Sequence, residues 1–341
     1  MTLLLPTGAV MEQAESATKR VAVCAVTAGG GLLARVLAGK LAGAELLDCR
    51  GGVAQVVQKA WPEYDGFIFV MAAGIVVRTI APLMTDKRRD PCVVVCDELG
   101  RFAVSLLSGH LGGGNELARR VAEVTGGQPV ITTASDTLGL TALDLWMRDK
   151  GLAAERDADV TRLSGILVNR GRLRVFSDTV LPELPPDLEP VANMAEADCI
   201  VSSRTNWNQP DALFLRPKNL VIGIGCNRGT ARELIEAAVV STLESSHLSL
   251  LSLHSLASID LKADEEGLLA YARLRGLAIL FFPSEALNRV EGITRSAAVF
   301  QATGAHGVAE PAALLAARRG RLIVPKIKYR DVTIAIVEKY L

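Results

Sequence analysis

A histidine in a glycine-rich turn is the first group in the sequence that could do chemistry. His110, one of four histidines, lies in "SLLSGHLGGGNELARR", between an apolar run that ends at Leu107 and a segment with helical periodicity. A neutral imidazole there could act as a general base, and open α/β sheets place their sites at the carboxyl ends of strands. The alternative is a structural or merely exposed histidine. Ser108 lies too near in sequence to be paired with it, and no GxSxG motif marks a serine nucleophile.

Two glycine-rich turns could bind anions. "SGHLGGGNEL" and "GIGCNRGTARE" both precede helical patterns, and the start of a helix offers unpaired N–H groups with about half a positive charge. Neither turn contains a lysine-bearing phosphate loop, and the GxGxxxG of the second is one residue longer than the dinucleotide fingerprint. The sequence therefore favours a carboxylate or phosphate site over NAD binding, with tight strand–helix packing as the alternative.

Further charged and nucleophilic residues have two readings each. Arg78 and Lys87 belong to "RTIAPLMTDKRRDP", which is either a carboxylate-binding cluster or a solvated turn. Glu310 is either an acid/base group or part of a helix start with Pro311 at its first position. Cys226 precedes a helix and neighbours Arg228, and both features would lower a thiol pKa, although a nucleophilic role is the less favoured reading.

The composition limits the class of protein. The chain has 341 residues, half of them apolar, and its 37 basic and 37 acidic residues cancel. At roughly 100–200 residues per domain, two domains are expected. Zero net charge argues against a general nucleic-acid binder, and 4% aromatic residues argue against base-stacking platforms. The six cysteines include no CxxC pair, so no metal site is expected.

The absence of recognisable targeting signals in the sequence predicts a cytoplasmic protein. No apolar run approaches the roughly 18 residues that a membrane span needs, and the first residues make a poor signal peptide. Cys92 and Cys96 are interpreted as buried strand thiols in a reducing compartment. Met11 is a second possible start of translation.

Short apolar runs alternate with helical patterns, which predicts two α/β domains with parallel or mixed sheets, joined by a less regular middle segment. Strands are expected within 20–30, 66–74, 92–98, 101–107 and 129–136, and a second strand–turn–helix unit opens at 219–239. Residues 181–190 contain four prolines and are expected to form a loop. The expected divisions are a disordered tail at 1–19, a domain at 20–145, a middle or linker region at 146–218 and a domain at 219–341.

Long segments resemble one family. The stretch "AAGIVVRTIAPLMTDKRRDPCVVVCDELGRFAVSLLSGHLGGGNELA" looks like the amino-terminal signature of the cobalamin-biosynthesis CbiG family, the cobalt-precorrin-5A hydrolases. "VIGIGCNRGT", "IDLKADEEGL" and "GVAEPAALLAA…LIVPKIK" look like that family's carboxy-terminal domain. The resemblance covers about 66–140 and 219–338, whereas the residues between them are generic.

The resemblance implies a hydrolase of anaerobic vitamin B12 synthesis. Water would open the lactone of a cobalt-bound, ring-contracted tetrapyrrole, and acetaldehyde would leave to give cobalt-precorrin-5B. The cobalt belongs to the substrate, so no cofactor is expected. His110 and Glu310 are the candidate catalytic residues. The residues expected to bind the substrate's carboxylates are Arg78, Lys87, Ser108, Gly109, Gly112, Gly113, Asn115, Gly225, Cys226, Arg228, Lys262 and Lys326.

Other functions remain open at this point. The chain could be a corrinoid carrier without catalytic activity, and acetaldehyde release would separate the two. A nucleotide-dependent enzyme is disfavoured because the phosphate-binding motifs are missing. A tetrapyrrole is the expected partner, with no nucleic acid and no membrane, while contacts with neighbouring pathway enzymes and a homodimer are left open.

Overall fold

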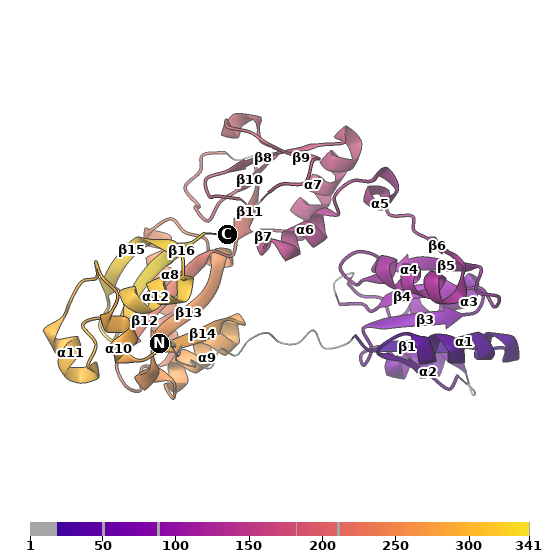
Figure 1. Cartoon of the computed structure of the whole chain (residues 1–341), viewed down its shortest axis with the longest axis horizontal. Coiled ribbons are helices and arrows are strands. Elements are labelled where there is room, and N and C mark those ends of the chain that lie inside the picture. Colours follow the sequence, from indigo (N-terminus) through magenta and orange to yellow (C-terminus); the bar gives the residue numbers. More distant parts are fainter. Residues whose placement is uncertain (1–18, 50–51, 87–88, 182, 210–211, 341) are drawn as a thin grey trace, which may run out of the picture. The chain divides into compact units, whose positions relative to one another are not determined.

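The computed structural model describes residues 19–49, 52–86, 89–181, 183–209 and 212–340 (Figure 1). The chain divides into two compact units, the first ending at Gly139 and the second beginning at Leu140. Apart from Lys19, the expected tail lies outside the described residues. Within the described ranges, no helix is both long and apolar enough to cross a lipid bilayer.

The first unit is built on a six-stranded sheet. Its strands, in spatial order, are β2 Ala44–Leu46, β1 Val21–Ala25, β3 Gly66–Val70, β4 Cys92–Cys96, β5 Phe102–Leu107 and β6 Gln128–Val130. Strands β1 to β4 run parallel, β5 is antiparallel to β4, and β6 is parallel to β5. The sheet is therefore mixed, as the sequence allows.

Helices cover both faces of this sheet. They are α1 Ala28–Lys40, α2 Val53–Ala60, α3 Ala73–Ile80 and α4 Gly114–Thr125, and the short helix α5 Ala134–Leu138 follows β6. Helices α1 and α4 contribute Leu37 and Val121 to one core, and α2 and α3 contribute Val57 and Val76 to the other. Because both faces are covered, β3 and β4 are buried along their whole length and read as continuous apolar runs.

The reversal at β5 decides where the His110 turn lies. Since β5 runs against β1, β3 and β4, its carboxyl end lies at the edge of the sheet where those strands begin. The Ser108 hydroxyl donates a hydrogen bond to the Asp90 carbonyl, 3.2 Å away and just before β4. His110 therefore follows the carboxyl end of its own strand, but it lies at the opposite edge from the glycine turn that follows β1.

The strand expected over 129–136 is wrong beyond Val130. Strand β6 stops there, and the short helix α5 begins at Ala134. Its sequence "ASDTL" carries the small polar residues that favour helix starts over strands. This helical turn brings Asp136 to His110.

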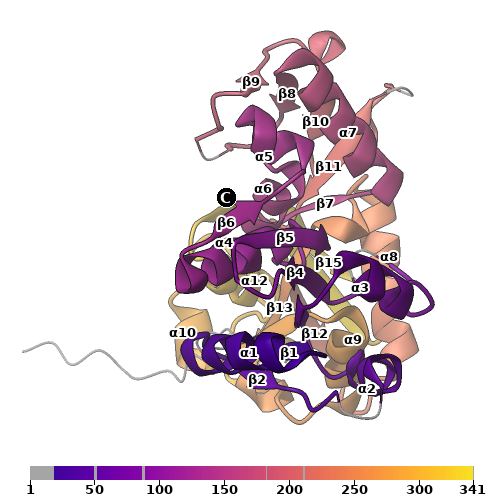
Figure 2. The same ribbon diagram turned by 90° about the vertical axis from the view of Figure 1, so that its right-hand side faces the viewer.

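The second unit contains two sheets. The first contains, in spatial order, β7 Leu152–Ala154, β11 Leu213–Pro217, β10 Cys199–Val201, β8 Leu173–Ser177 and β9 Leu188–Pro190. Helices α6 Leu143–Asp149 and α7 Asp157–Arg170 pack on it (Figures 1 and 2). Residues 146–218 thus carry a sheet of their own. The loop expected over 181–190 is present at 183–187, but residues 188–190 form strand β9.

The second sheet carries the carboxy-terminal glycine turn. Its strands, in spatial order, are β14 Ala278–Phe282, β13 Leu253–Ile259, β12 Leu220–Cys226, β16 Val332–Lys339 and β15 Gly320–Lys328. Strands β12 to β14 are parallel, and β16 is antiparallel to both of its neighbours. Its helices are α8 Arg232–Ser245, α9 Glu266–Arg275, α10 Ser284–Asn288, α11 Ala297–Thr303 and α12 Ala309–Ala317.

Candidate functional site

The turn that carries His110 is folded tightly by its glycines. Ser108 has a positive φ of 52°, a backbone conformation that residues other than glycine seldom adopt. A β-carbon on Gly112 would lie 2.5 Å from the Ser108 β-carbon, and one on Gly109 would lie 2.6 Å from Asn115 Oδ1. Close packing against the Ser108 backbone therefore requires glycine at position 112, whereas a β-carbon at position 109 would displace the Asn115 side chain.

Asp136 holds the imidazole in place. His110 Nε2 lies 2.9 Å from Asp136 Oδ2, and Asn115 Nδ2 donates to the same oxygen at 2.9 Å. Arg119 donates to the other oxygen at 2.8 Å. Partial burial raises the pKa of Asp136, but the hydrogen bonds from His110 and Arg119 lower it by more, so its net pKa lies below the usual aspartate value. An ionised aspartate therefore faces the ring.

This geometry assigns the two ring nitrogens. An ionised carboxylate can only accept hydrogen bonds, so Nε2 donates its proton to Asp136 and Nδ1 becomes the basic nitrogen. The Ser135 hydroxyl also lies near Nε2, at 3.2 Å. A serine–histidine–aspartate triad needs serine and aspartate on different nitrogens, so Ser135 is not placed as a nucleophile. The arrangement fits a general base that activates water.

Several backbone amides that were expected to bind an anion in this turn already donate hydrogen bonds within the chain. The amides of Gly113, Gly114 and Asn115 donate to the carbonyls of His110, Ser108 and Gly109, respectively, at 2.9–3.1 Å. These amides therefore cannot bind a substrate oxyanion without breaking the turn. The Gly112 carbonyl accepts a hydrogen bond from Lys19 Nζ at 2.8 Å, which brings a positive charge to the turn.

Among the described residues of the basic stretch at 78–91, Asp90 lies at the edge of the sheet that carries the His110 turn. Asp90 lies next to Ser108 and accepts the Thr85 amide at 2.9 Å. Arg78 is exposed on α3 and donates to the Gly74 carbonyl of its own helix at 3.0 Å. Lys87 lies outside the described residues.

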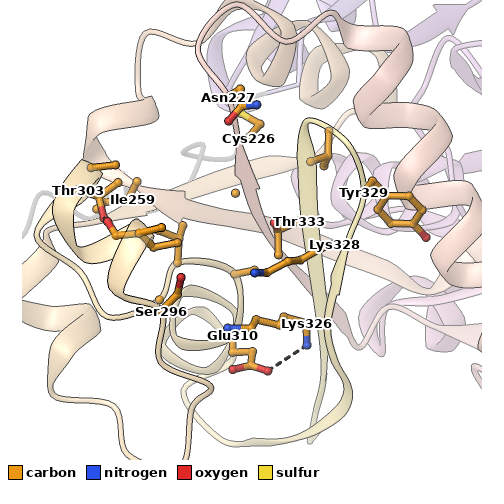
Figure 3. A pocket seen from close by; sticks show the side chains of 18 of the residues that line it. Cys226, Asn227, Ile259, Ser296, Thr303, Glu310, Lys326, Lys328, Tyr329 and Thr333 are labelled. Atoms are coloured by element: carbon orange, nitrogen blue, oxygen red, sulfur yellow. Dashed lines mark hydrogen bonds between the residues drawn. The ribbon is translucent and has the colours of Figure 1, made fainter.

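The carboxy-terminal sheet contains a cavity of about 400 Å³ at the carboxyl end of β12 (Figure 3). Its walls come from β12, the segment around α11 and α12, and the hairpin β15–β16. The sequence-predicted residues among its lining are Gly225, Cys226, Lys262, Glu310 and Lys326. Arg228 is not among them, and its guanidinium pairs with Asp264 at 2.5 Å on the surface.

Glu310 is an anchor for the cavity wall. Its carboxylate is 3% exposed and accepts the amides of Thr294 and Lys326 at 2.7 and 3.0 Å and the Thr294 hydroxyl at 3.3 Å. These bonds tie the loop before α11 to β15, and they favour a positioning role over acid/base chemistry. Helix α12 begins at Ala309, so Pro311 is its third residue and not its first.

Cys226 has the opposite electrostatics to those expected from sequence. Burial raises the pKa of its thiol, and the charges of Lys262 and Arg228 oppose this only in part. In the second glycine turn, the Gly229 amide is not available to a ligand, because it donates a hydrogen bond to the buried Glu265 carboxylate at 2.6 Å. These observations argue against a thiolate nucleophile at Cys226 and against an open phosphate site at the second glycine turn.

Sequence reasoning missed Asp136 and Lys328. The strand expected over 129–136 hides Asp136, although "TTASD" also carries a helix-start signal. Lys328 gives no local signal, because its place in the cavity depends on three distant segments. Among the described residues, no cluster of three or more histidine, cysteine, aspartate or glutamate side chains could hold a metal ion.

Both sites lie inside regions matched by family models. Residues 55–136, which include His110 and Asp136, match "Cobalamin synthesis G N-terminal", and residues 220–337, which include the cavity, match "Cobalamin synthesis G C-terminus". Two α/β units carrying both regions in this order define a cobalamin synthesis G protein, and the chain belongs to this family.

The curated relatives have a specific name. The cobalt-precorrin-5A hydrolase of Priestia megaterium is 35% identical over 84% of this chain and 82% of its own length. That of Salmonella typhimurium is 32% identical over 93% of this chain and 97% of its own length. Among solved structures, a cobalamin biosynthesis protein G homologue from Sulfolobus solfataricus is 20% identical, with a TM-score of 0.38, and the match covers 94% of this chain and 97% of that one.

Proposed function

We propose that this chain is a cobalt-precorrin-5A hydrolase of vitamin B12 biosynthesis. The observation that carries the proposal is the imidazole of His110 held by the ionised Asp136, inside the region matched by the amino-terminal family model. Relatives of that name, matched over most of both chains, support the same reaction.

The reaction needs a base twice. The substrate's lactone joins the ring A acetate to the methylated carbon expelled from the macrocycle. His110 takes a proton from water, which attacks the lactone carbonyl. As the lactone opens, the imidazolium returns this proton to the leaving alkoxide, so an alcohol forms and His110 is neutral again. The new carboxylic acid loses its proton to solvent. The base then removes the proton of that alcohol, the bond from its carbon to the ring breaks, and acetaldehyde leaves. The bonding electrons pass into the conjugated macrocycle. General-base catalysis is worth roughly 10²–10⁴ in rate.

A carrier that only binds corrinoids is the less favoured alternative. Binding alone does not need a histidine whose tautomer is fixed by a carboxylate, itself held by Asn115 and Arg119. We also propose that the enzyme needs no nucleotide and no resident metal, since the cobalt arrives with the substrate. A cytoplasmic enzyme is consistent with six unpaired thiols.

Acetaldehyde release tests the proposal. Purified protein is mixed with cobalt-precorrin-5A without nucleotide or added metal, and acetaldehyde is trapped as its dinitrophenylhydrazone and measured by chromatography. We expect wild-type turnover, and a loss of at least 10²-fold in His110→Ala, the lower end of general-base effects. His247→Asn is the matched control, because His247 is exposed and has a positive φ that asparagine tolerates.

Two results would count against it. An absolute requirement for ATP or NAD would reject the cofactor-free reaction. A His110→Ala variant within threefold of wild type would return His110 to a structural role.

A further inference from the structure

The cavity of the carboxy-terminal sheet has more positive than negative charge available to a ligand. Its lining cations are Lys262, Lys326, Lys328 and Arg330, and its lining carboxylates are Glu310 and Asp331. Both carboxylates are already satisfied: Glu310 by backbone amides, and Asp331 by Asn227, which donates to it at 2.9 Å. The cavity is therefore suited to an anion.

Lys328 is the cation best placed to meet that anion. Lys262 pairs with Glu265 at 3.1 Å, and Lys326 donates to the Thr294 carbonyl at 2.7 Å. Arg330 is 96% exposed beside Asp331. The side chain of Lys328 makes no hydrogen bond or ion pair with any described residue, and Figure 3 shows it extending into the cavity.

Part of the cavity wall is apolar and made of small side chains. They belong to Ala298, Val299, Ala302 and Val308. A fully ionic ligand such as free phosphate would gain nothing from this wall, whereas a carboxylate on a hydrocarbon arm would pack its methylenes there and present its charge to Lys328.

The volume limits how much of a ligand enters. Ligand pockets usually measure about 300–1,000 Å³ and hold drug-sized molecules, so about 400 Å³ lies near the lower end. A four-ring macrocycle with carboxylate arms around its rim is larger than such molecules. One arm and part of its pyrrole ring can enter the cavity, while the rest of the macrocycle stays outside.

We propose that this cavity binds one acetate or propionate arm of the corrinoid substrate, with Lys328 contacting its carboxylate. The proposal rests on the proposed function for the identity of the ligand. It adds a binding site to that function and explains why the carboxy-terminal sheet has a cationic cavity that the base chemistry of His110 does not use.

Cobyrinic acid, a stable corrinoid with free carboxylates, and its neutral heptamethyl ester are suitable probes. Binding to the full chain is measured by equilibrium dialysis, followed by the visible absorption of the corrin. We expect the acid to bind at least tenfold more tightly than the ester. Lys328→Gln should weaken acid binding about tenfold and leave ester binding unchanged, because it removes one charge-assisted hydrogen bond. Lys218→Gln, an exposed lysine outside the cavity, should change neither.

A second variant keeps the test independent of charge. Ala302 is exposed on α11 and lines the cavity, so Ala302→Phe should fill the space without entering a core and weaken acid binding at least tenfold. Acid binding within twofold of wild type in both Lys328→Gln and Ala302→Phe would overturn the proposal. Competition by inorganic phosphate as strong as by free cobyrinic acid would overturn the assignment to a corrinoid arm.

Failure of this site and failure of the proposed function are distinguishable. If wild type releases acetaldehyde but both Lys328→Gln and Ala302→Phe bind cobyrinic acid normally, the cavity proposal is wrong and the enzymatic function stands. If cobyrinic acid binds through Lys328 but no acetaldehyde forms, the cavity proposal stands and the hydrolase function is wrong.

Discussion

Asp136 fixes His110 through one ring nitrogen, and Asn115 and Arg119 in turn fix Asp136. In the proposed mechanism Asp136 is therefore a positioning residue, because it acts through the proposed base His110. In Asp136→Asn the amide could hold the ring in the wrong tautomer, and the loss of a neighbouring anion lowers the pKa of an imidazolium. We expect turnover to fall at least tenfold and the apparent pKa of the base in the pH–rate profile to move down.

The pH profile separates positioning from simple destabilisation. A purely structural defect would lower the rate at every pH without moving the midpoint. Asp264→Asn, which removes a surface ion pair with Arg228, serves as the control and should leave the profile unchanged. An Asp136→Asn enzyme with an unshifted midpoint would contradict the role given to Asp136.

The same carboxylate makes stability depend on pH. Because the pKa of Asp136 is lowered in the folded state, its stabilisation is fully present above the unfolded pKa, about 3.9, and is lost as pH falls through the lower folded value. Asp136→Asn should therefore melt below wild type at pH 7, and the difference should shrink at pH 3. A difference that grows toward acid pH would show that the sign is wrong.

The predictability of the site differs from residue to residue. His110 could be found from sequence, because an isolated histidine at the end of an apolar run stands out. Asp136 required knowledge that β6 ends at Val130, and the anchoring role of Glu310 required its contact with Thr294, sixteen residues away. Long-range contacts of this kind leave no periodic signal in one sequence.

At the scale of elements, the placement of α12 on β12 shapes the cavity. Gly223 makes this possible, because a β-carbon at this position would collide with the Ala309 carbonyl. Helix α12 carries Glu310, which ties the cavity wall together, so the close approach of strand and helix positions the site. The sequence predicted this strand and a helix start near Pro311, but not that a glycine on one would touch the backbone of the other.

Gly223→Ala should consequently be severely destabilising. Overpacking usually costs about 1–3 kcal/mol, and collision with a backbone atom places this substitution at about 3 kcal/mol or above. Gly165→Ala is the matched control: Gly165 lies inside α7, a β-carbon there would meet nothing within 4 Å, and φ is not positive. The control should be neutral or stabilising by up to about 1 kcal/mol. Urea unfolding monitored by circular dichroism measures both, and equal stability of the two variants would contradict the packing argument.

At the scale of the whole molecule, alternating strands and helices predicted the α/β class. The middle region was harder to assign, because its three-residue strands β7 and β9 are too short to show a pattern. The reversal of β5 was also hidden, since an apolar run has no direction. These features depend on which strands pair, and pairing is decided by contacts that are distant in sequence.

Each compact unit has its own cores, which predicts that the two units fold separately. The cores of the first unit draw on residues up to Val124, and those of the second begin at Leu140. All residues that line the carboxy-terminal cavity lie within 225–333, whereas His110 and Asp136 belong to the first unit.

A protein spanning residues 140–341 should therefore fold and bind cobyrinic acid within threefold of the full chain, yet release no acetaldehyde above background. The same piece with Lys328→Gln should bind about tenfold more weakly. A folded 140–341 piece without corrinoid affinity would show that the cavity alone does not hold the ligand, and acetaldehyde release by this piece would remove His110 from the reaction.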